Sequence, residues 1–235
     1  MLKQRTFWLI LSLAVLATGW RARAADEPPQ PQTFWQDRSN DPVDVNALRE
    51  AGPLGDTVIG KPGAPVTVIE YASLACPVCR VFHAKVFPKM KKDYIDTGKV
   101  VFIYREFPIG KAAQGAAAAA RCVPAKDYFR IGERLMANQG KWAGADVMPD
   151  ALYKLVQDSG ISRAQFDTCL ANQPINDGIV WSKQRGRKLG VQGTPTFFIN
   201  DRKVRGMLSY EEMQKLIEQH LASATRVQPD AVKVR

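Results

Sequence analysis

Two cysteines one helical turn apart, in Cys76-Pro77-Val78-Cys79, are the side chains of this sequence best suited to covalent chemistry. Thiols at this spacing can form and reopen a disulfide, one attacking and the other resolving a mixed disulfide. A cysteine at a helix N-terminus is favoured as the thiolate, because free N–H groups and the positive end of the helix face it. We therefore expect Cys76 to be the nucleophile and Cys79 the resolving thiol.

A metal site is the alternative interpretation of two cysteines at this spacing. Structural zinc usually takes four ligands, often from a second cysteine or histidine pair. Cys122 and Cys169 are far away in the sequence, and His83, seven residues after Cys76, would complete a set of only three. The pattern therefore favours redox chemistry over a copper- or zinc-binding thiol site, and we predict neither a metal nor another cofactor.

The residues around the cysteines predict a strand, a helix and a second strand. Val66–Ala72 is rich in β-branched and aromatic residues and is typical of a buried strand. Pro77 suits the first turn of the following helix, over residues 80–92, and Pro88 predicts a kink or restart within it. Residues 99–107 form another apolar run, so a parallel strand–helix–strand unit is expected.

The second half of the sequence predicts a helical insertion and then a return to the sheet. Residues 111–190 have helical character throughout and include an alanine-rich run and a capping box at Ser162. Residues 196–200 and 203–204 predict a hairpin that turns at Asn200-Asp201. A capping box at Ser209 opens a last helix, which we expect to end near Leu221.

The N-terminus has the features of a secretory signal. Lys3 and Arg5 precede a short apolar stretch, and Ala22-Arg23-Ala24 is a cleavage site that predicts a mature chain from Ala25. The alternative is an uncleaved membrane anchor, which Arg21 and Arg23 favour. The apolar stretch is shorter than the roughly 20 residues that a spanning helix needs. We therefore expect an exported, periplasmic protein.

The formal net charge of the whole chain is +10, and the predicted signal supplies four basic residues and no acid. The remaining basic clusters, residues 89–92 and 183–188, fall on predicted helices and are interpreted as solvated faces. Nucleic acid is not expected as a partner of an exported protein.

Four cysteines in an exported chain imply two disulfides. If Cys76 pairs with Cys79, the second bridge joins Cys122 to Cys169, as a structural disulfide of the helical insertion. The alternative is that these two are separate buried cysteines that act as small apolar residues.

An ordered set of short motifs resembles one known family. The motifs are Glu70-Tyr71-Ala72-Ser73 before the cysteine pair, Phe82-His83 after it, Tyr104-Arg105-Glu106-Phe107-Pro108, and residues 190–198 with Gly193-Thr194-Pro195. The set is similar to the DsbA-like thiol:disulfide oxidoreductases of the thioredoxin superfamily, over about residues 58–221. The resemblance implies a thioredoxin fold, in which helices flank a central mixed sheet, with an inserted all-helical subdomain.

The resemblance also implies roles for individual residues. Pro195 matches a cis-proline that aligns the client backbone, and Thr194 matches the residue that touches the active-site sulfur. Without the resemblance, a trans proline is the default. Glu70 matches a buried acid that relays protons for Cys79; the alternative is an outward residue on a half-buried strand. His83 is expected to pack or hydrogen-bond rather than act as a base.

One position departs from the strongly oxidising members of the family. They carry a histidine where this chain has Val78, which offers the thiolate neither a charge nor a strong donor. Thr194 is also found among disulfide isomerases.

The chain is predicted to comprise six parts. They are a signal peptide (1–24), an extended N-terminal arm (25–57), the first half of the thioredoxin fold (58–110), the helical subdomain (111–190), the second half of the fold (191–222) and a loose tail (223–235).

The resemblance implies a monomer that introduces disulfides into reduced exported polypeptides. A DsbB-type, quinone-linked membrane oxidase would then reoxidise it. An isomerase or reductase of the same fold is the alternative function.

Overall fold

A mixed five-stranded sheet with the strand order β1-β3-β2-β4-β5 forms the centre of the described part of the chain. The strands are β1 (Thr57–Ile59), β2 (Val66–Ala72), β3 (Val100–Glu106), β4 (Thr196–Ile199) and β5 (Arg202–Arg205). Strands β2 and β3 are parallel, with Val66 opposite Val100, and the other neighbours are antiparallel. The predicted parallel unit, hairpin and thioredoxin fold are therefore confirmed.

The computed structural model describes residues 43–226, all of which belong to one compact unit. The predicted signal, the first part of the predicted arm and the last residues of the predicted tail lie outside the described residues.

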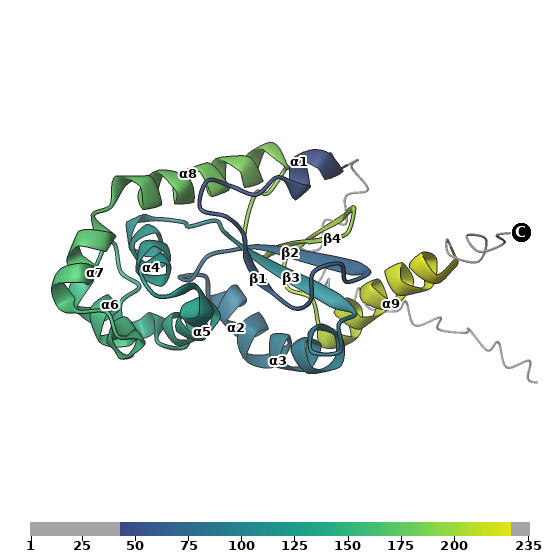
Figure 1. Ribbon diagram of the computed structural model, residues 1–235, viewed down its shortest axis with the longest axis horizontal. Helices are drawn as coiled ribbons and strands as arrows, with labels where there is room; N and C mark the ends of the chain where they lie inside the picture. The colour runs from purple at the N-terminus through teal and green to yellow at the C-terminus, as the bar shows by residue number, and fades with distance from the viewer. Residues whose placement is uncertain (1–42, 227–235) are drawn as a thin grey trace, which may run out of the picture. The chain divides into compact units, whose positions relative to one another are not determined.

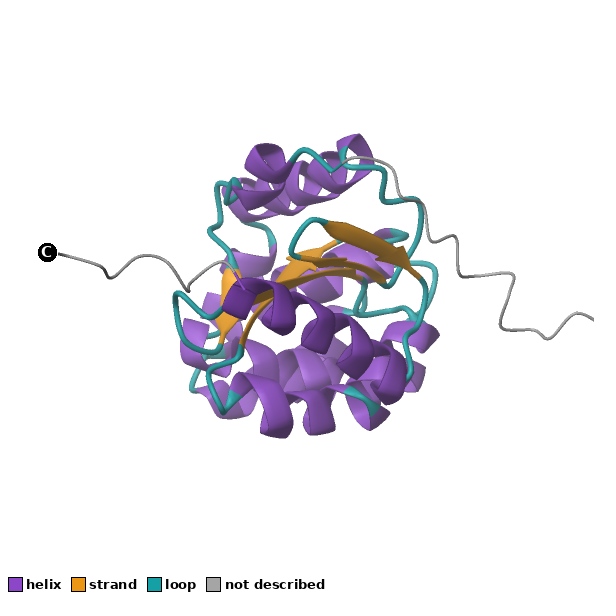
Figure 2. Cartoon of the chain, turned by 90° about the vertical axis from the view of Figure 1, so that its right-hand side faces the viewer, coloured by secondary structure: helices purple, strands orange, loops and turns teal. Residues whose placement is uncertain are grey.

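Helices separate the two halves of the sheet in sequence and cover both of its faces in space (Figure 1, Figure 2). They are α1 (Val45–Arg49), α2 (Pro77–Lys85), α3 (Phe87–Met90), the π-helical turn η2 (Lys91–Ile95), α4 (Lys111–Arg121), α5 (Tyr128–Ala137), α6 (Pro149–Val156), α7 (Arg163–Leu170), α8 (Gln173–Lys188) and α9 (Tyr210–Arg226). Short 3-10 turns occupy residues 125–127, 139–141 and 157–159. In the order of the sequence, helices α4 to α8 all come after β3 and before β4.

Side chains along β2 point alternately to the two faces of the sheet, and they therefore pack into two different cores. Val66 and Val68 pack into a core with helices α2, α3 and α9, whereas Ile69 and Tyr71 pack into a second core beside α1 and α8. Successive residues of a strand point to opposite faces. Glu70 therefore faces the same layer as Val68, which is the layer of helix α2.

The helix that follows the cysteines is broken near Pro88, as predicted. Helix α2 ends at Lys85, and α3 begins at Phe87 with Pro88 in its first turn. Proline has no N–H to donate to the carbonyl four residues earlier, so a continuous helix would lose a hydrogen bond here.

The last helix is longer than predicted, because α9 continues to Arg226 instead of ending near Leu221. The residues after Leu221 are Ala222, Ser223 and Ala224, and the next proline or glycine is Pro229. Alanine has the highest helix propensity, so the helix continues where the sequence turns polar. The prediction that a loose tail begins at residue 223 is therefore wrong, because α9 includes residues 223–226.

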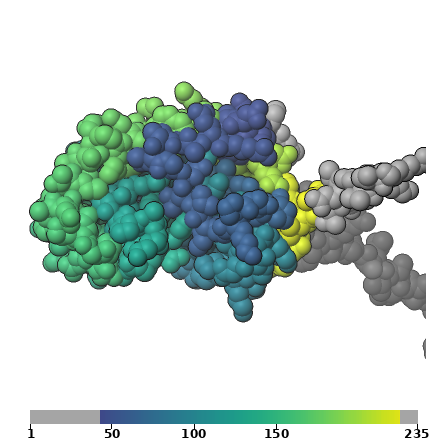
Figure 3. Space-filling view, in the orientation of Figure 1, coloured from purple at the N-terminus to yellow at the C-terminus, as the bar shows by residue number. Residues whose placement is uncertain are grey.

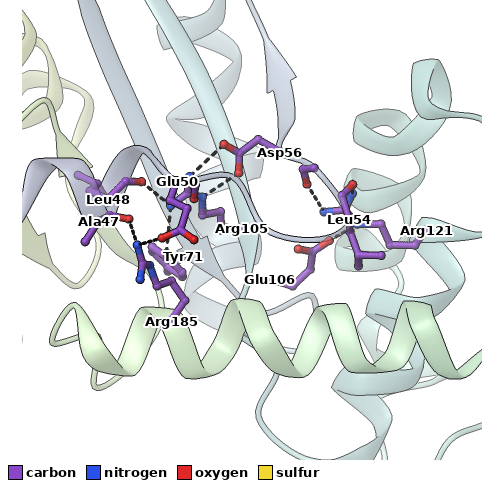
Figure 4. A network of polar contacts seen from close by, with 11 residues as sticks. Ala47, Leu48, Glu50, Leu54, Asp56, Tyr71, Arg105, Glu106, Arg121 and Arg185 are labelled. Atoms are coloured by element: carbon purple, nitrogen blue, oxygen red, sulfur yellow. Dashed lines mark hydrogen bonds and ion pairs between the residues drawn. The ribbon is translucent and has the colours of Figure 1, made fainter.

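The described residues before β1 lie along the surface beside α8 (Figure 3). Figure 4 shows how two arginines hold this segment. Arg105, which is 4% exposed, donates to both carboxylate oxygens of Asp56 at 2.8 and 2.9 Å and to the Leu48 carbonyl at 2.7 Å. Arg185 donates to the Ala47 carbonyl and to Glu50. Residues 43–56 are therefore bound to the sheet and to α8.

Candidate active site

Cys76 is the N-cap of helix α2, at the point where the chain leaves β2. The N–H of Cys79 donates to Cys76 Sγ at 3.4 Å, and Cys76 Sγ donates to the Thr194 carbonyl at 3.3 Å. The pKa of Cys76 is lowered to about 6, chiefly because the Cys79 thiol donates a hydrogen bond to its sulfur. The Thr194 side chain and the N–H groups of Cys79 and Val78 lower this pKa further, against the opposing effect of partial burial.

Cys79 is fully buried, and neither it nor Cys76 is in a disulfide in this structure. Burial raises the pKa of the Cys79 thiol well above its usual value, and its hydrogen bond to Cys76 and the charge of Glu70 raise it further. The two thiols therefore differ strongly in acidity: one is accessible and readily ionised, and the other is buried and holds its proton.

Glu70 is completely buried on β2 and contacts the active-site helix. Its Oε2 lies 2.8 Å from Nε2 of His83, which is also buried. The outward orientation that the sequence left open for Glu70 does not occur. His83 forms a hydrogen bond, as expected, and its partner is Glu70.

Among residues 43–226, no group of three or more histidine, cysteine and acidic side chains is arranged to hold a metal ion.

The loop before β4 carries the proline that the sequence singled out. The Thr194–Pro195 peptide bond is cis, and the Pro195 carbonyl accepts a hydrogen bond from the N–H of Gly206 at 2.9 Å. The Thr196 hydroxyl donates to the Gly193 carbonyl at 2.8 Å. These contacts hold the Thr194 carbonyl beside the Cys76 sulfur.

Gln139, in the 3-10 turn after α5, contacts the active-site turn and was not singled out from the sequence. Its Nε2 donates to the carbonyls of Leu74 and Cys76 at 2.7 and 3.0 Å. One amide group therefore links the helical insertion to the turn that carries Cys76. A glutamine between two helices has no distinctive signal in the sequence, because its role depends on contacts with residues more than 60 positions away.

Cys122 and Cys169 are joined by a disulfide whose Cα atoms are 5.8 Å apart. Cys122 is the C-cap of α4 and Cys169 lies in α7, so the bond connects two helices of the insertion.

Val78, which lies between Cys76 and Cys79 in the sequence, is 42% exposed.

No helix within residues 43–226 combines the length and the apolar character that crossing a membrane requires.

Comparison with known proteins finds a match to the thioredoxin family over residues 54–219. Disulfide bond formation protein D of Bacillus subtilis is 31% identical over 172 residues, which cover 71% of this chain and 78% of that protein. A Rickettsia typhi relative whose name refers to protein-disulfide oxidoreductases is 30% identical over 173 residues. The chain spans 64% of the length of that relative and 53% of the length of another, from Rickettsia conorii.

Among solved structures, alpha-DsbA1 of Wolbachia pipientis is 32% identical and superposes with a TM-score of 0.68. The matched region covers 73% of this chain and 94% of the Wolbachia chain.

Proposed function

Because this chain is a DsbA-like member of the thioredoxin superfamily, we propose that it is an exported thiol:disulfide oxidoreductase that introduces disulfides into other exported proteins. The observation that carries this proposal is the unequal acidity of Cys76 and Cys79. A pair of this kind releases one sulfur readily as a thiolate and keeps the other protected within the fold.

The reaction begins with oxidised Cys76–Cys79. A client thiolate attacks Cys76 Sγ, the bond between Cys76 and Cys79 breaks, and Cys79 leaves with the electron pair and takes up a proton. A second thiolate of the client then attacks the client sulfur of the mixed disulfide. The client disulfide forms, Cys76 leaves as a thiolate, and the dithiol form of the protein remains. Since the pKa of Cys76 is about 6, this thiolate is a good leaving group at neutral pH.

Three other residues serve this exchange. The cis-Pro195 loop aligns the client backbone beside Cys76, and Thr194 contributes its carbonyl next to the reacting sulfur. Glu70 exchanges a proton with Cys79, since it is the buried carboxyl group whose charge acts on that thiol.

The proposed location is the periplasm, where the signal at residues 1–24 would deliver the protein after cleavage behind Ala24. Its proposed partners are reduced exported polypeptides and a DsbB-type, quinone-linked membrane oxidase that accepts the electrons of the dithiol form. We propose that the protein acts as a monomer.

The test is a single turnover between the oxidised protein and a reduced, unfolded client that contains two thiols. Wild-type protein should produce one client disulfide for each Cys76–Cys79 pair consumed. Cys76→Ser should produce none, and Cys79→Ser, first loaded at Cys76 with a client that contains a single thiol, should hold the mixed disulfide. Client oxidation by Cys76→Ser at the wild-type rate would refute the proposal.

The direction of exchange is tested by equilibrating the Cys76–Cys79 pair with glutathione. We expect a reduction potential above that of thioredoxin, about −270 mV, and below that of the strongest oxidant of the family, about −120 mV. A value at or below that of thioredoxin would instead favour the reductase, and faster repair of a scrambled client than oxidation of a reduced one would favour the isomerase.

A further inference from the structure

A small cavity lies beneath the active-site helix, on the side of the helical insertion. It has a volume of about 10 Å³, close to the minimum for one water molecule. The residues that line it are Leu74, His83, Tyr104, Tyr128, Phe129, Gly132, Glu133 and Met136. Because Glu133 is exposed on α5, the lining of the cavity extends from the buried His83 to a residue at the protein surface.

Buried polar atoms of the cavity-lining residues lack a hydrogen-bond partner within the described part of the chain. They are Nδ1 of His83 and the hydroxyl of Tyr104. The Tyr128 hydroxyl donates to Glu106 at 2.9 Å and can still accept a hydrogen bond. A buried water typically makes two to four hydrogen bonds to groups of this kind, and leaving such groups unpaired is unfavourable.

The other ring nitrogen of His83 faces the redox pair. His83 Nε2 contacts Glu70, and the charge of Glu70 acts on the buried thiol of Cys79. His83 is therefore the link between this cavity and the carboxyl group beneath Cys79.

We propose that the cavity holds one water molecule and that His83 relays protons between this water and Glu70. The inference rests on the proposed function, since the proton is needed only if Cys79 is released as a thiolate. When Cys79 leaves, Glu70 gives it a proton. His83 then accepts a proton at Nδ1 from the water and releases one at Nε2 to Glu70, and the water regains its proton from the solvent beside Glu133. Reoxidation reverses each transfer.

Several titratable or charged groups surround His83 and bear on the pH dependence of this relay. They are Glu70 from β2, Cys79 from α2, Tyr104 and Glu106 from β3, Arg121 from α4 as the partner of Glu106, and Tyr128 and Glu133 from α5.

The first test replaces His83 by glutamine, which keeps an N–H for Glu70 but cannot accept one proton while releasing another. Rapid quenching measures the rate at which a client thiolate forms the mixed disulfide and releases Cys79, from pH 5 to pH 9. We expect His83→Gln to slow this step by about tenfold or more and to change its pH profile, in line with the effects of acid–base groups. His220→Gln is the matched control and should match wild type. A folded His83→Gln variant with the wild-type rate and pH profile would overturn the proposal.

The second test fills the cavity and leaves His83 in place. A Cβ atom at Gly132 would meet only Cδ2 of Leu74, at 3.8 Å, which is an ordinary contact, so Gly132→Ala should fold. Its methyl group narrows the cavity, and we expect the same step to slow by severalfold. Gly144→Ala is the matched control, since a Cβ at this exposed position meets no atom within 4 Å. An unchanged rate in Gly132→Ala would contradict the relay.

The third test is a high-resolution crystal structure of the wild-type protein. We expect an ordered water within hydrogen-bond distance of His83 Nδ1 and the Tyr104 hydroxyl, and a dry cavity would overturn the proposal. A failure of the proposed function can be told apart from a failure of the relay, because wild-type protein would then show no Cys76-dependent exchange at all.

Discussion

The reactivity of the site depends on a few atoms around the Cys76 sulfur. A hydrogen bond from the Cys79 thiol has the largest effect on its pKa, and the start of α2 contributes the N–H groups of Val78 and Cys79. The same hydrogen bond raises the pKa of Cys79, because the donor must keep its proton. One contact therefore makes one thiol more acidic and the other less so.

This difference predicts how alkylation of the reduced protein depends on pH. The thiolate is the reactive form, so the alkylation rate of Cys76 should rise with pH and reach half of its maximum near pH 6. Peptide mapping after a short reaction at pH 6 should find the label on Cys76 and not on Cys79. Equal labelling of both cysteines would contradict the assignment of the nucleophile.

Val78 offers a second prediction at the residue scale. It is 42% exposed and supplies no side-chain donor to the thiolate, so Val78→His should lower the pKa of Cys76 further and make the protein more oxidising. The glutathione equilibrium and the pH dependence of alkylation measure both effects. Val78→Gln separates the effect of charge from that of side-chain size. A potential that stays unchanged, or becomes more reducing, in Val78→His would refute this explanation.

At the scale of elements, helix α2 depends on the insertion as well as on the sheet. The 3-10 turn at residues 139–141 carries Gln139, whose amide donates to two carbonyls of the turn before α2. The helical insertion thereby takes part in fixing the orientation of Cys76.

Replacing Gln139 tests this link. Gln139→Ala removes both hydrogen bonds, so we expect slower alkylation of Cys76 at pH 6 and a loss of about 1–2 kcal/mol in the free energy of unfolding. Urea unfolding and alkylation kinetics measure the two effects. Gln157→Ala, at an exposed position of another 3-10 turn, is the control. Wild-type reactivity in a destabilised Gln139→Ala variant would show that Gln139 affects stability alone.

The disulfide between α4 and α7 closes a loop between residues 47 positions apart. In the chain-entropy model a loop of this length stabilises the fold by about 4 kcal/mol. We expect it to resist a mild dithiol that reduces Cys76–Cys79, since structural disulfides are harder to reduce than exchanging ones. Mass spectrometry after alkylation should show two modified cysteines, both in the Cys76–Cys79 peptide.

Four modified cysteines would show that the Cys122–Cys169 bond is labile. The double variant Cys122→Ala/Cys169→Ala is the control, and it should unfold at lower urea concentration and still exchange disulfides through Cys76.

At the scale of the whole molecule, the segment before β1 is part of the fold that supports the site. Arg105, on β3, binds Asp56 and the carbonyl groups of Leu48 and Glu50, and it also contacts the Tyr71 hydroxyl on β2. A buried arginine with this many acceptors joins the segment, the sheet and the second core.

Arg105→Met should therefore release the segment. The change leaves Asp56 and two carbonyls without their donor, and loss of one partner of a buried ion pair costs about 3–5 kcal/mol. Amide hydrogen exchange should rise over residues 43–56, and urea should unfold the variant earlier. Arg49→Met, at an exposed position of α1, is the control. Wild-type exchange over residues 43–56 in Arg105→Met would contradict this role.

The sequence by itself determined the features that arise from neighbouring residues. The strand before Cys76, the helix beginning at Pro77, the break near Pro88 and the capping boxes at Ser162 and Ser209 all follow from local pattern and hydrogen bonding, and the structure contains each of them. Helix α9 ends later than the sequence predicts, because a polar composition is a weaker signal than alanine propensity.

Only the tertiary structure decided the contacts that make the site work. The sequence allowed Glu70 to face either side of a half-buried strand, and only the packing of α2 against the sheet places His83 beside it. Gln139 has no local sequence signal at all. Thr194 lies 118 residues from Cys76 in the chain, and Arg105 lies 49 residues from Asp56. Such pairings depend on how the layers pack, and a local sequence pattern carries no information about which distant residue a buried polar atom will meet.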